Sequence, residues 1–431
     1  MSVRASKSNV WLHAILVFAL LLATGLPLLA EEKEEEVVTF ADAIRQGDPI
    51  VNLRYRFEGV SEAGWSKDAS ASTIRAQIGY RTAKWNGLWM LAEYQGNFSI
   101  PATQYYNSTG NGQLQYPVVA DPVDQEMAEA YLAYSFKDHG DLKAGLQKVN
   151  VSNQRFFGSV AWRQLEQIFS GATFKGKVWK DLTVHYGYLA HVTRVFGEHT
   201  PNSILQPRSI STNLLDVSYK FKPGTIHGYA HFIDLKDWNA FPFFVSHKNV
   251  GLRFDGGVKL SENVKLLYTG EYAKQSEYKD SPDTVDADYG LLRLGVKVSG
   301  VTVRVGYEML GGDGVYAFQT PFATLHKFNG WADRFLTTPR DGIKDTYIDV
   351  GGTFEKVKLL ARYHSFDRDN GDEKYGKELD LLAFRPLGKM FGVGLKYARY
   401  DARADLPNET PLTPIYNRDV DKFWLWLQMK L

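Results

Sequence analysis

Residues 301–309 of the chain read VTVRVGYEM, and this stretch shows the pattern that decides the fold. Its odd-numbered residues are apolar, whereas Thr302, Arg304 and Glu308 are polar or charged. Successive side chains of a β-strand point to opposite faces of the sheet, so strict alternation predicts a strand with one apolar and one polar face.

The same period of two recurs along most of the chain. Residues 51–58, for example, read VNLRYRFE and place Arg54 and Arg56 on one face. The 24 Tyr, 25 Phe, 10 Trp and 38 Gly suit strands and turns better than helices. We count about eighteen such segments. The predicted strands are residues 50–58, 72–81, 87–98, 126–136, 141–148, 169–178, 182–192, 213–222, 225–234, 248–260, 264–273, 288–298, 301–310, 345–354, 357–366, 377–385, 390–400 and 420–431.

The connections between these segments alternate in length. Short turns occupy residues 83–86, 137–140, 222–224 and 386–389. Long loops occupy residues 99–125, 193–212, 274–287, 311–344 and 401–419. A meander that keeps its long loops at one end is typical of outer-membrane β-barrels, whose short turns face the periplasm. A soluble β-sandwich has no reason to keep this order.

The sequence therefore predicts an all-β fold, a closed antiparallel transmembrane β-barrel of the bacterial outer membrane. In hydrocarbon each unpaired backbone N–H or C=O group costs several kcal/mol, so a sheet can span a membrane only when it closes. The apolar face would then contact lipid, and the polar face would surround a water-filled lumen. Residues 423–431 alternate to the last residue, like the C-terminal signal that the barrel-assembly machinery recognises, so we expect that machinery as a partner.

The N-terminal residues predict export. Arg4 and Lys7 precede an apolar run at residues 10–22, and Ala30 follows at a suitable cleavage position. This order is typical of a signal peptide over residues 1–30. The alternative, an uncleaved anchor, is disfavoured because the run is short for a membrane span. We expect residues 31–47 to form an acidic periplasmic segment and residues 48–431 to form the barrel.

Overall charge and cysteine content exclude several classes of protein. The 50 basic and 49 acidic residues leave no excess that would favour nucleic acid. The absence of cysteine excludes disulfides and thiolate metal sites. We expect a monomer surrounded by outer-membrane lipid.

The residues on the predicted inward face are mostly basic. A lumen lined by arginine and lysine favours anions, because low-dielectric walls focus the field of these charges along the path. The alternative is that wall charges pair across strands and neutralise one another. The pore-lining candidates on the wall are Arg54, Arg56, Arg75, Arg253, Arg293, Arg304, Arg362, Lys143, Lys175 and Lys358.

Two long loops carry distinctive motifs. One contains Asn153-Gln154-Arg155-Phe156-Phe157-Gly158 and Trp162-Arg163-Gln164 and leads into Phe169-Ser170-Gly171-Ala172; the other contains His326-Lys327-Phe328-Asn329-Gly330-Trp331-Ala332-Asp333. These stretches resemble the alginate-export family of outer-membrane porins. The resemblance implies an eighteen-stranded barrel whose electropositive constriction passes a polyuronate chain.

That resemblance also implies roles for individual residues. Arg155 and Arg163 would lie on an infolded loop, opposite Arg75, Arg304 and Arg362 on the wall, because the arginine fork binds carboxylates bidentately. The alternative is that Arg155 and Arg163 pin the loop to acidic wall residues such as Glu129. Lys327, Asp333 and Arg334 are expected to shape and cap their own loop.

We expect no enzyme, catalytic residue, cofactor or metal. No nucleophile elbow, zinc-protease, P-loop or dinucleotide motif occurs in the sequence. Inward-facing His185, His191, His227 and His231 could meet as a metal site, but polar lining of the lumen is the favoured interpretation. Asp313 is interpreted as a turn residue rather than a Ca²⁺ ligand.

The expected function is an anion-favouring channel that passes an anionic solute or an acidic polysaccharide such as alginate. The first alternative is a general small-solute porin of the same fold. A membrane-embedded enzyme and an adhesive barrel with a plugged lumen are further alternatives.

Overall fold

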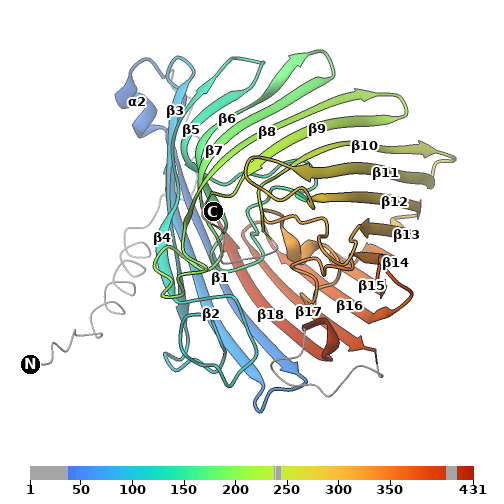
Figure 1. Cartoon of the computed structure of the whole chain (residues 1–431). Helices are drawn as coiled ribbons and strands as arrows, with labels where there is room; N and C mark the ends of the chain where they lie inside the picture. Colours follow the sequence, from blue (N-terminus) through green and yellow to red (C-terminus); the bar gives the residue numbers. More distant parts are fainter. Residues whose placement is uncertain (1–36, 237, 239–243, 404–414) are drawn as a thin grey trace, which may run out of the picture.

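The computed structural model is a single β-barrel and describes residues 37–236, 238, 244–403 and 415–431 (Figure 1). The predicted signal peptide and the acidic residues 31–36 lie outside the described residues. Eighteen strands form one sheet in which each strand pairs antiparallel with its neighbours in the sequence. The first strand also pairs with the last, from Asn52↔Lys430 to Glu62↔Val420, so the sheet is closed. The predicted eighteen-stranded fold is confirmed.

The bounds of the elements are as follows. The strands are β1 (Asp48–Glu62), β2 (Ala69–Arg81), β3 (Leu88–Ser99), β4 (Asp124–Ser135), β5 (Asp141–Gln147), β6 (Ile168–Trp179), β7 (Leu182–Thr193), β8 (Arg208–Phe221), β9 (Gly224–Asp234), β10 (His247–Lys259), β11 (Val264–Glu277), β12 (Asp286–Val298), β13 (Val301–Leu310), β14 (Ile343–Phe354), β15 (Val357–Asp367), β16 (Lys374–Leu387), β17 (Phe391–Ala402) and β18 (Val420–Lys430). The described helices are α2 (Phe40–Arg45) and the 3₁₀ turns η1 (Leu325–Lys327) and η2 (Ile415–Asn417).

Every predicted segment contains a strand, and the differences lie at the ends. β8 begins at Arg208 rather than at residue 213, and β1 and β2 extend to Glu62 and from Ala69. The alternation of apolar and polar residues stops where the wall leaves the hydrocarbon. Backbone pairing with the neighbouring strand continues beyond that point, so the strands are longer than the pattern that predicts them.

The connections divide the barrel into two ends. The end with the short turns, called the short-turn end, carries the turns at residues 180–181, 222–223, 299–300 and 355–356, among others. The opposite end, called the long-loop end, carries residues 100–123, 148–167, 194–207, 311–342 and 415–419. The first connection at this end, residues 63–68, is short because β1 and β2 extend toward each other.

The outer surface of the barrel is apolar and uncovered. On β13, Val305 is 54% exposed and Tyr307 is 40% exposed, whereas Glu308 on the inner face is 4% exposed. Other strands show the same inversion of a soluble protein's polarity, for example at Leu252 and Leu292. An uncovered apolar band of this kind fits the hydrocarbon of a membrane. Within the described residues, no helix is both long enough and apolar enough to cross a membrane.

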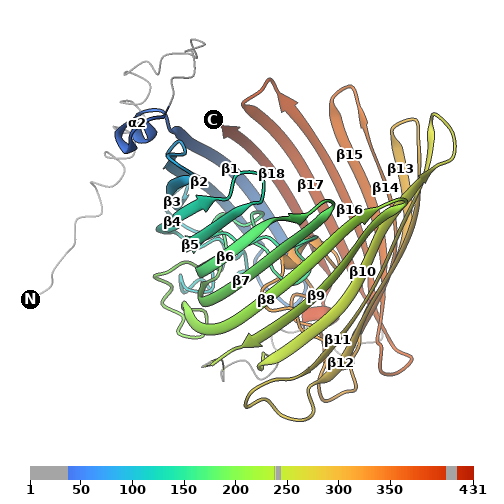
Figure 2. The same ribbon diagram turned by 90° about the horizontal axis from the view of Figure 1, so that it is seen from above.

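The buried aromatic core lies inside the lumen rather than within the wall. It forms where residues 148–167 and 311–342 fold into the barrel (Figures 1 and 2). Phe156 and Phe157 of the first loop pack on Phe318 and Phe322 of the second, with ring centroids 6.1 Å and 5.7 Å apart. Such pairs contribute about 0.5–1.5 kcal/mol each beyond the burial of their area. The two loops are therefore held as one packed unit.

Helix α2 lies against the outside of the wall beside β2 and β3 (Figures 1 and 2). Thr39 and Asp42 form a capping box at its start, which satisfies backbone N–H groups that have no partner within the helix. Phe40 packs edge-on against Trp85 at a centroid distance of 5.9 Å, in the turn between β2 and β3. These contacts attach the N-terminal part of the chain to the short-turn end.

Candidate functional site

The two infolded loops contact each other through backbone and side-chain hydrogen bonds. We call residues 148–167 loop A and residues 311–342 loop B. The N–H of Gly158 donates to the carbonyl oxygen of Phe322 at 2.9 Å, and the Thr324 hydroxyl donates to Gln154 at 2.8 Å. A Cβ atom at Gly158 would lie 2.1 Å from Thr324 Oγ1, so glycine permits this close approach.

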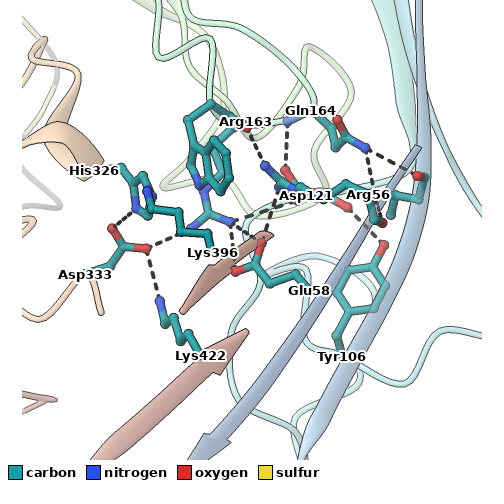
Figure 3. Close-up of polar contacts among 12 residues, drawn as sticks. Arg56, Glu58, Tyr106, Asp121, Arg163, Gln164, His326, Asp333, Lys396 and Lys422 are labelled. Carbon is teal, nitrogen blue, oxygen red and sulfur yellow. Dashed lines mark hydrogen bonds and ion pairs between the residues drawn. The ribbon is translucent and has the colours of Figure 1, made fainter. Parts of the chain in front are cut away.

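Arg163 of loop A connects three parts of the structure (Figure 3). Its Nη1 lies 3.1 Å from Glu58 of β1, and its Nη2 lies 2.9 Å from Asp333 of loop B. Burial alone would lower the pKa of Arg163, but the carboxylates of Glu58 and Asp333 raise it above its ordinary value. The guanidinium is therefore charged, buried and fully engaged.

Asp121 brings a third loop, residues 100–123, into the same cluster (Figure 3). Its carboxylate pairs with Arg56 of β1 and accepts the N–H of Gln164 at 2.9 Å. The Tyr106 hydroxyl donates to the carbonyl oxygen of Asp121 at 2.9 Å. Burial would raise the pKa of Asp121, but Arg56 and Arg163 hold it below its ordinary value.

Arg54 of β1 donates hydrogen bonds to loop A. Its Nη2 donates to the carbonyl oxygen of Arg163 at 2.6 Å, and its Nε donates to the side chain of Gln164 at 2.9 Å. Arg75 of β2 lies 3.4 Å from Glu166 at the end of the same loop. The predicted pore-lining residues Arg54, Arg56 and Arg75 therefore contact the loop and are buried beneath it.

Arg155 pins the other side of loop A. Its Nε lies 2.9 Å from Glu308 of β13, and its Nη2 donates to Asn329 of loop B at 3.1 Å. Both loop arginines thus make the contacts of the second interpretation, in which they attach the loop to acidic wall residues. The partners are Glu58 and Glu308 rather than Glu129, which accepts the backbone N–H of Lys148.

The opposite wall carries arginines that are partly exposed. Arg304 of β13 and Arg362 of β15 share Asp349, each at 3.6 Å, and their side chains are 33% and 18% exposed. Arg253 of β10 lies 2.6 Å from Asp255. Within the described residues, Arg293 of β12 has no carboxylate within 4.0 Å and instead donates to the Thr269 hydroxyl at 3.1 Å.

The predicted lysines lie near the short-turn end of the lumen. Lys143 of β5 approaches the Tyr131 hydroxyl at 3.3 Å, and its ammonium lies 4.7 Å from the centre of the Tyr131 ring. Lys175 and Lys358 are exposed. Among the residues that the structure describes, none of these three lysines forms an ion pair with a carboxylate.

The histidines are distributed along the wall rather than gathered. His231 lies 2.9 Å from Asp216, and His227 lies 3.6 Å from Asp255. The described residues contain no group of three or more His, Cys, Asp or Glu side chains that could hold a metal ion. Asp313 accepts the N–H groups of Val315 and Tyr316, each at 2.8 Å, which is the geometry of a turn residue.

The alternation of residues did not predict a cluster of tryptophans around Lys396 of β17. The Lys396 ammonium lies 3.6 Å from the Trp331 ring centre and 4.4 Å from that of Trp162. It also lies 2.6 Å from Nε2 of His326. Such cation–π contacts stabilise a buried ammonium that has lost its water. The alternation of residues in β17 gives Lys396 an inward direction, but no local pattern indicates which aromatic residues surround it.

His326 lies between Lys396 and Asp333 and contacts both side chains (Figure 3). Burial lowers the pKa of His326 to about 3, so the ring is neutral and its Nδ1–H donates to Asp333 at 2.7 Å. Asp333 also lies 3.0 Å from Lys422 of β18. The expectation that Asp333 shapes only its own loop is therefore incomplete, because its carboxylate also binds Arg163 and the wall. Likewise, Arg334 lies 3.0 Å from Glu62 of β1.

The comparisons with known proteins identify the fold. No protein-family profile matches the chain, and no curated protein matches it in sequence. The structure matches Acinetobacter baumannii OccAB4 with a TM-score of 0.66 and 15% identity, covering 89% of this chain and 98% of that one. It matches Pseudomonas aeruginosa OpdQ with a TM-score of 0.66 and 14% identity, covering 91% and 99%. It matches Pseudomonas aeruginosa OccK9 (OpdG) with a TM-score of 0.67 and 13% identity, covering 90% and 100%.

The predicted resemblance to the alginate-export family is wrong. The matching structures named above are Occ/Opd barrels, and no family profile supports the alginate-export assignment. The structure explains why these motifs do not identify the family. His326 and Asp333 bind each other, and Trp331 packs on Lys396, so the motif of loop B encodes packing inside an eighteen-stranded barrel. Packing of this kind does not specify a cargo.

Proposed function

We propose that the chain is an outer-membrane porin that passes small solutes and favours anions. The observation that carries the proposal is the inverted polarity of a closed barrel, in which Val305 and Tyr307 are exposed outside while Glu308 is buried inside. The likeness to the Occ/Opd porins of Pseudomonas and Acinetobacter supports the same reading. In this proposal residues 1–30 are removed during export and residues 48–431 act as a channel, without catalysis.

The anion preference rests on the arginines of the partly exposed wall. Arg304 and Arg362 flank Asp349 on adjacent strands, and their side chains remain 33% and 18% exposed, so both charges face the lumen. Arg293 has a hydroxyl partner and, within the described residues, no carboxylate. An arginine fork can bind a carboxylate bidentately, so a small solute carrying a carboxylate would fit this wall.

Loops A and B restrict what can pass. They fill the lumen with the packed rings of Phe157, Phe322 and neighbouring residues, and ion pairs such as Arg163–Glu58 hold them to the wall. A packed unit of this kind narrows the aqueous path. We therefore propose a small solute as the cargo.

Channel recordings of the purified protein in planar lipid bilayers test the proposal. Stepwise conductance is expected, with a reversal potential under a salt gradient that shows anions to be more permeant than cations. Arg293→Gln combined with Arg362→Gln should reduce the anion preference, because both side chains face the partly exposed wall. The control is Arg399→Gln, which removes an exposed arginine paired with Asp401 at the long-loop end. Absence of conductance from correctly inserted protein, or a cation preference, would contradict the proposal.

A further inference from the structure

Three lysines lie side by side at the short-turn end of the barrel. Lys259 is the last residue of β10 and pairs across the sheet with Lys265 of β11, which in turn pairs with Lys297 of β12. Each has the parity of a residue already placed in the lumen, since Lys259 follows Arg253 in steps of two and Lys297 likewise follows Arg293. The three side chains therefore share the inner face on adjacent strands.

These lysines differ from the arginines beneath the loops because they lack anionic partners. All three are exposed, and within the described residues none forms an ion pair with a carboxylate. Like charges directly opposite one another in a sheet are destabilising. The three ammonium groups therefore repel one another, which disfavours folding. An anion bound between them would reduce this repulsion.

A hollow of about 470 Å³ lies beside the three lysines. Its lining includes Lys259, Lys265 and Lys297, with Asn263 and Ser299 as neutral polar groups. Gly257 keeps the site open, since a Cβ atom there would lie 2.8 Å from Cε of Lys265.

One carboxylate, that of Glu262 in the turn between β10 and β11, also borders this hollow. Within the described part of the chain it forms no ion pair with the lysines. Three cations against one carboxylate leave the hollow positive. The alternation of β10 continues from Arg253 through Gly257 to Lys259, so the sequence itself gives this lysine an inward direction.

We propose that Lys259, Lys265 and Lys297 form an anion-binding site at the periplasmic mouth of the lumen and dominate the charge selectivity there. The site takes a solute that carries a carboxylate or phosphate group. This inference rests on the proposed porin function and specifies where anions are bound. Lysine ammonium groups act as mobile point charges, so binding is weak enough for the solute to leave.

The arginines of loop A are not available to bind a passing anion. Arg155 and Arg163 are buried and already paired with Glu308, Glu58 and Asp333. A neutralised, buried guanidinium contributes little field to a passing ion, whereas an exposed cation without a partner contributes its full charge. The net positive charge of the lumen is therefore concentrated away from the loops.

The test compares a triple variant with a matched control in the full-length barrel. Lys259→Gln, Lys265→Gln and Lys297→Gln together should lower the anion-to-cation permeability ratio at least about threefold, because a cleft of like charge concentrates counter-ions about tenfold or more. The control, Lys84→Gln, Lys180→Gln and Lys389→Gln, removes the same charge from exposed positions in other turns of the same end and should leave the ratio unchanged. The difference should grow as salt is lowered, since screening weakens.

Inorganic phosphate serves as the ligand probe. Added on the periplasmic side, it should reduce the wild-type current at lower concentration than when added on the other side, and the triple variant should lose this asymmetry. A triple variant with unchanged selectivity and unchanged phosphate response would overturn the site. If the wild type does not conduct at all, the porin function fails instead, so the two failures are distinct.

Lipid headgroups carry the same phosphate chemistry as the proposed solute. The titration is therefore repeated in bilayers of a zwitterionic lipid alone and in bilayers that also contain phosphatidylglycerol. A site for solutes keeps its phosphate response in both membranes. Loss of the response in the anionic membrane would show that lipid phosphate fills the site, and would overturn the assignment to a solute. Heat-dependent gel migration of each variant verifies that the barrel is folded.

Discussion

Replacement of Arg163 by methionine tests whether ion pairs hold the loops inside the barrel. The substitution roughly preserves the length of the side chain but removes its charge. It leaves Glu58, which is 1% exposed, and Asp333, which is 7% exposed, without this partner in a buried site. Removal of one member of a buried ion pair costs about 3–5 kcal/mol, because the remaining charge has lost its solvent and its partner. Lys422 still neutralises part of the Asp333 charge, so we expect about 3 kcal/mol, the lower end of that range.

Urea unfolding of the protein in lipid vesicles measures this free energy, and intrinsic tryptophan fluorescence reports it because Trp162 lies beside Arg163 in loop A. The matched control is Arg399→Met. Arg399 pairs with Asp401 at 2.9 Å, but both side chains are more than half exposed, so water replaces the lost contact and its loss should cost far less than that of Arg163. The Arg163→Met variant should also expose loop A to proteolysis from the long-loop end.

The pH dependence of the same variant has a definite sign. In the wild type, burial opposes ionisation of Asp333, but His326, Lys422 and Arg163 hold its pKa well below the ordinary value. Ion pairing therefore stabilises the fold above the ordinary carboxyl pKa and is lost as the pH falls through the lowered one. Without Arg163 the Asp333 carboxylate binds a proton more readily, so the deficit of the variant should shrink on acidification. Equal unfolding free energies for the Arg163→Met and Arg399→Met variants would refute the reasoning.

Two further predictions concern the loop contact and the lipid-facing wall. Gly158→Ala should separate loops A and B, because its Cβ would lie 2.1 Å from Thr324 Oγ1; we expect a loss of about 1–3 kcal/mol and faster proteolysis of loop B. The control Gly270→Ala adds a Cβ where no atom lies within 4 Å and should leave loop B protected. Val305→Lys should lower the free energy of unfolding in vesicles by about 2–4 kcal/mol, because it places a charge on the outer face. Thr302→Lys, on the inner face of the same strand, should be tolerated. Equal losses for the two variants would contradict the assignment of faces.

Much of the barrel followed from local pattern. The period of two in residues 301–309 identified a strand and the inner position of Glu308 before any contact was known, because side-chain direction in a strand depends only on backbone geometry. Closure followed from the same pattern, since an apolar outer face needs a membrane and a sheet in a membrane needs no free edge. The inward parity of Arg304, Arg362 and Lys297 was likewise accessible from sequence.

The partners of those charges were decided only by the tertiary structure. Arg163 meets Glu58 and Asp333 across 105 and 170 residues of chain, and no local pattern encodes such a separation. The sequence showed that basic residues exceed acidic residues on the inner face, but it did not show which of them are neutralised. Closure of the sheet and infolding of two loops bury Arg163 with its carboxylates and leave Lys297 exposed. The physical reason is that residue type and parity set where a charge points, whereas its field depends on what the rest of the chain brings within a few ångströms of it.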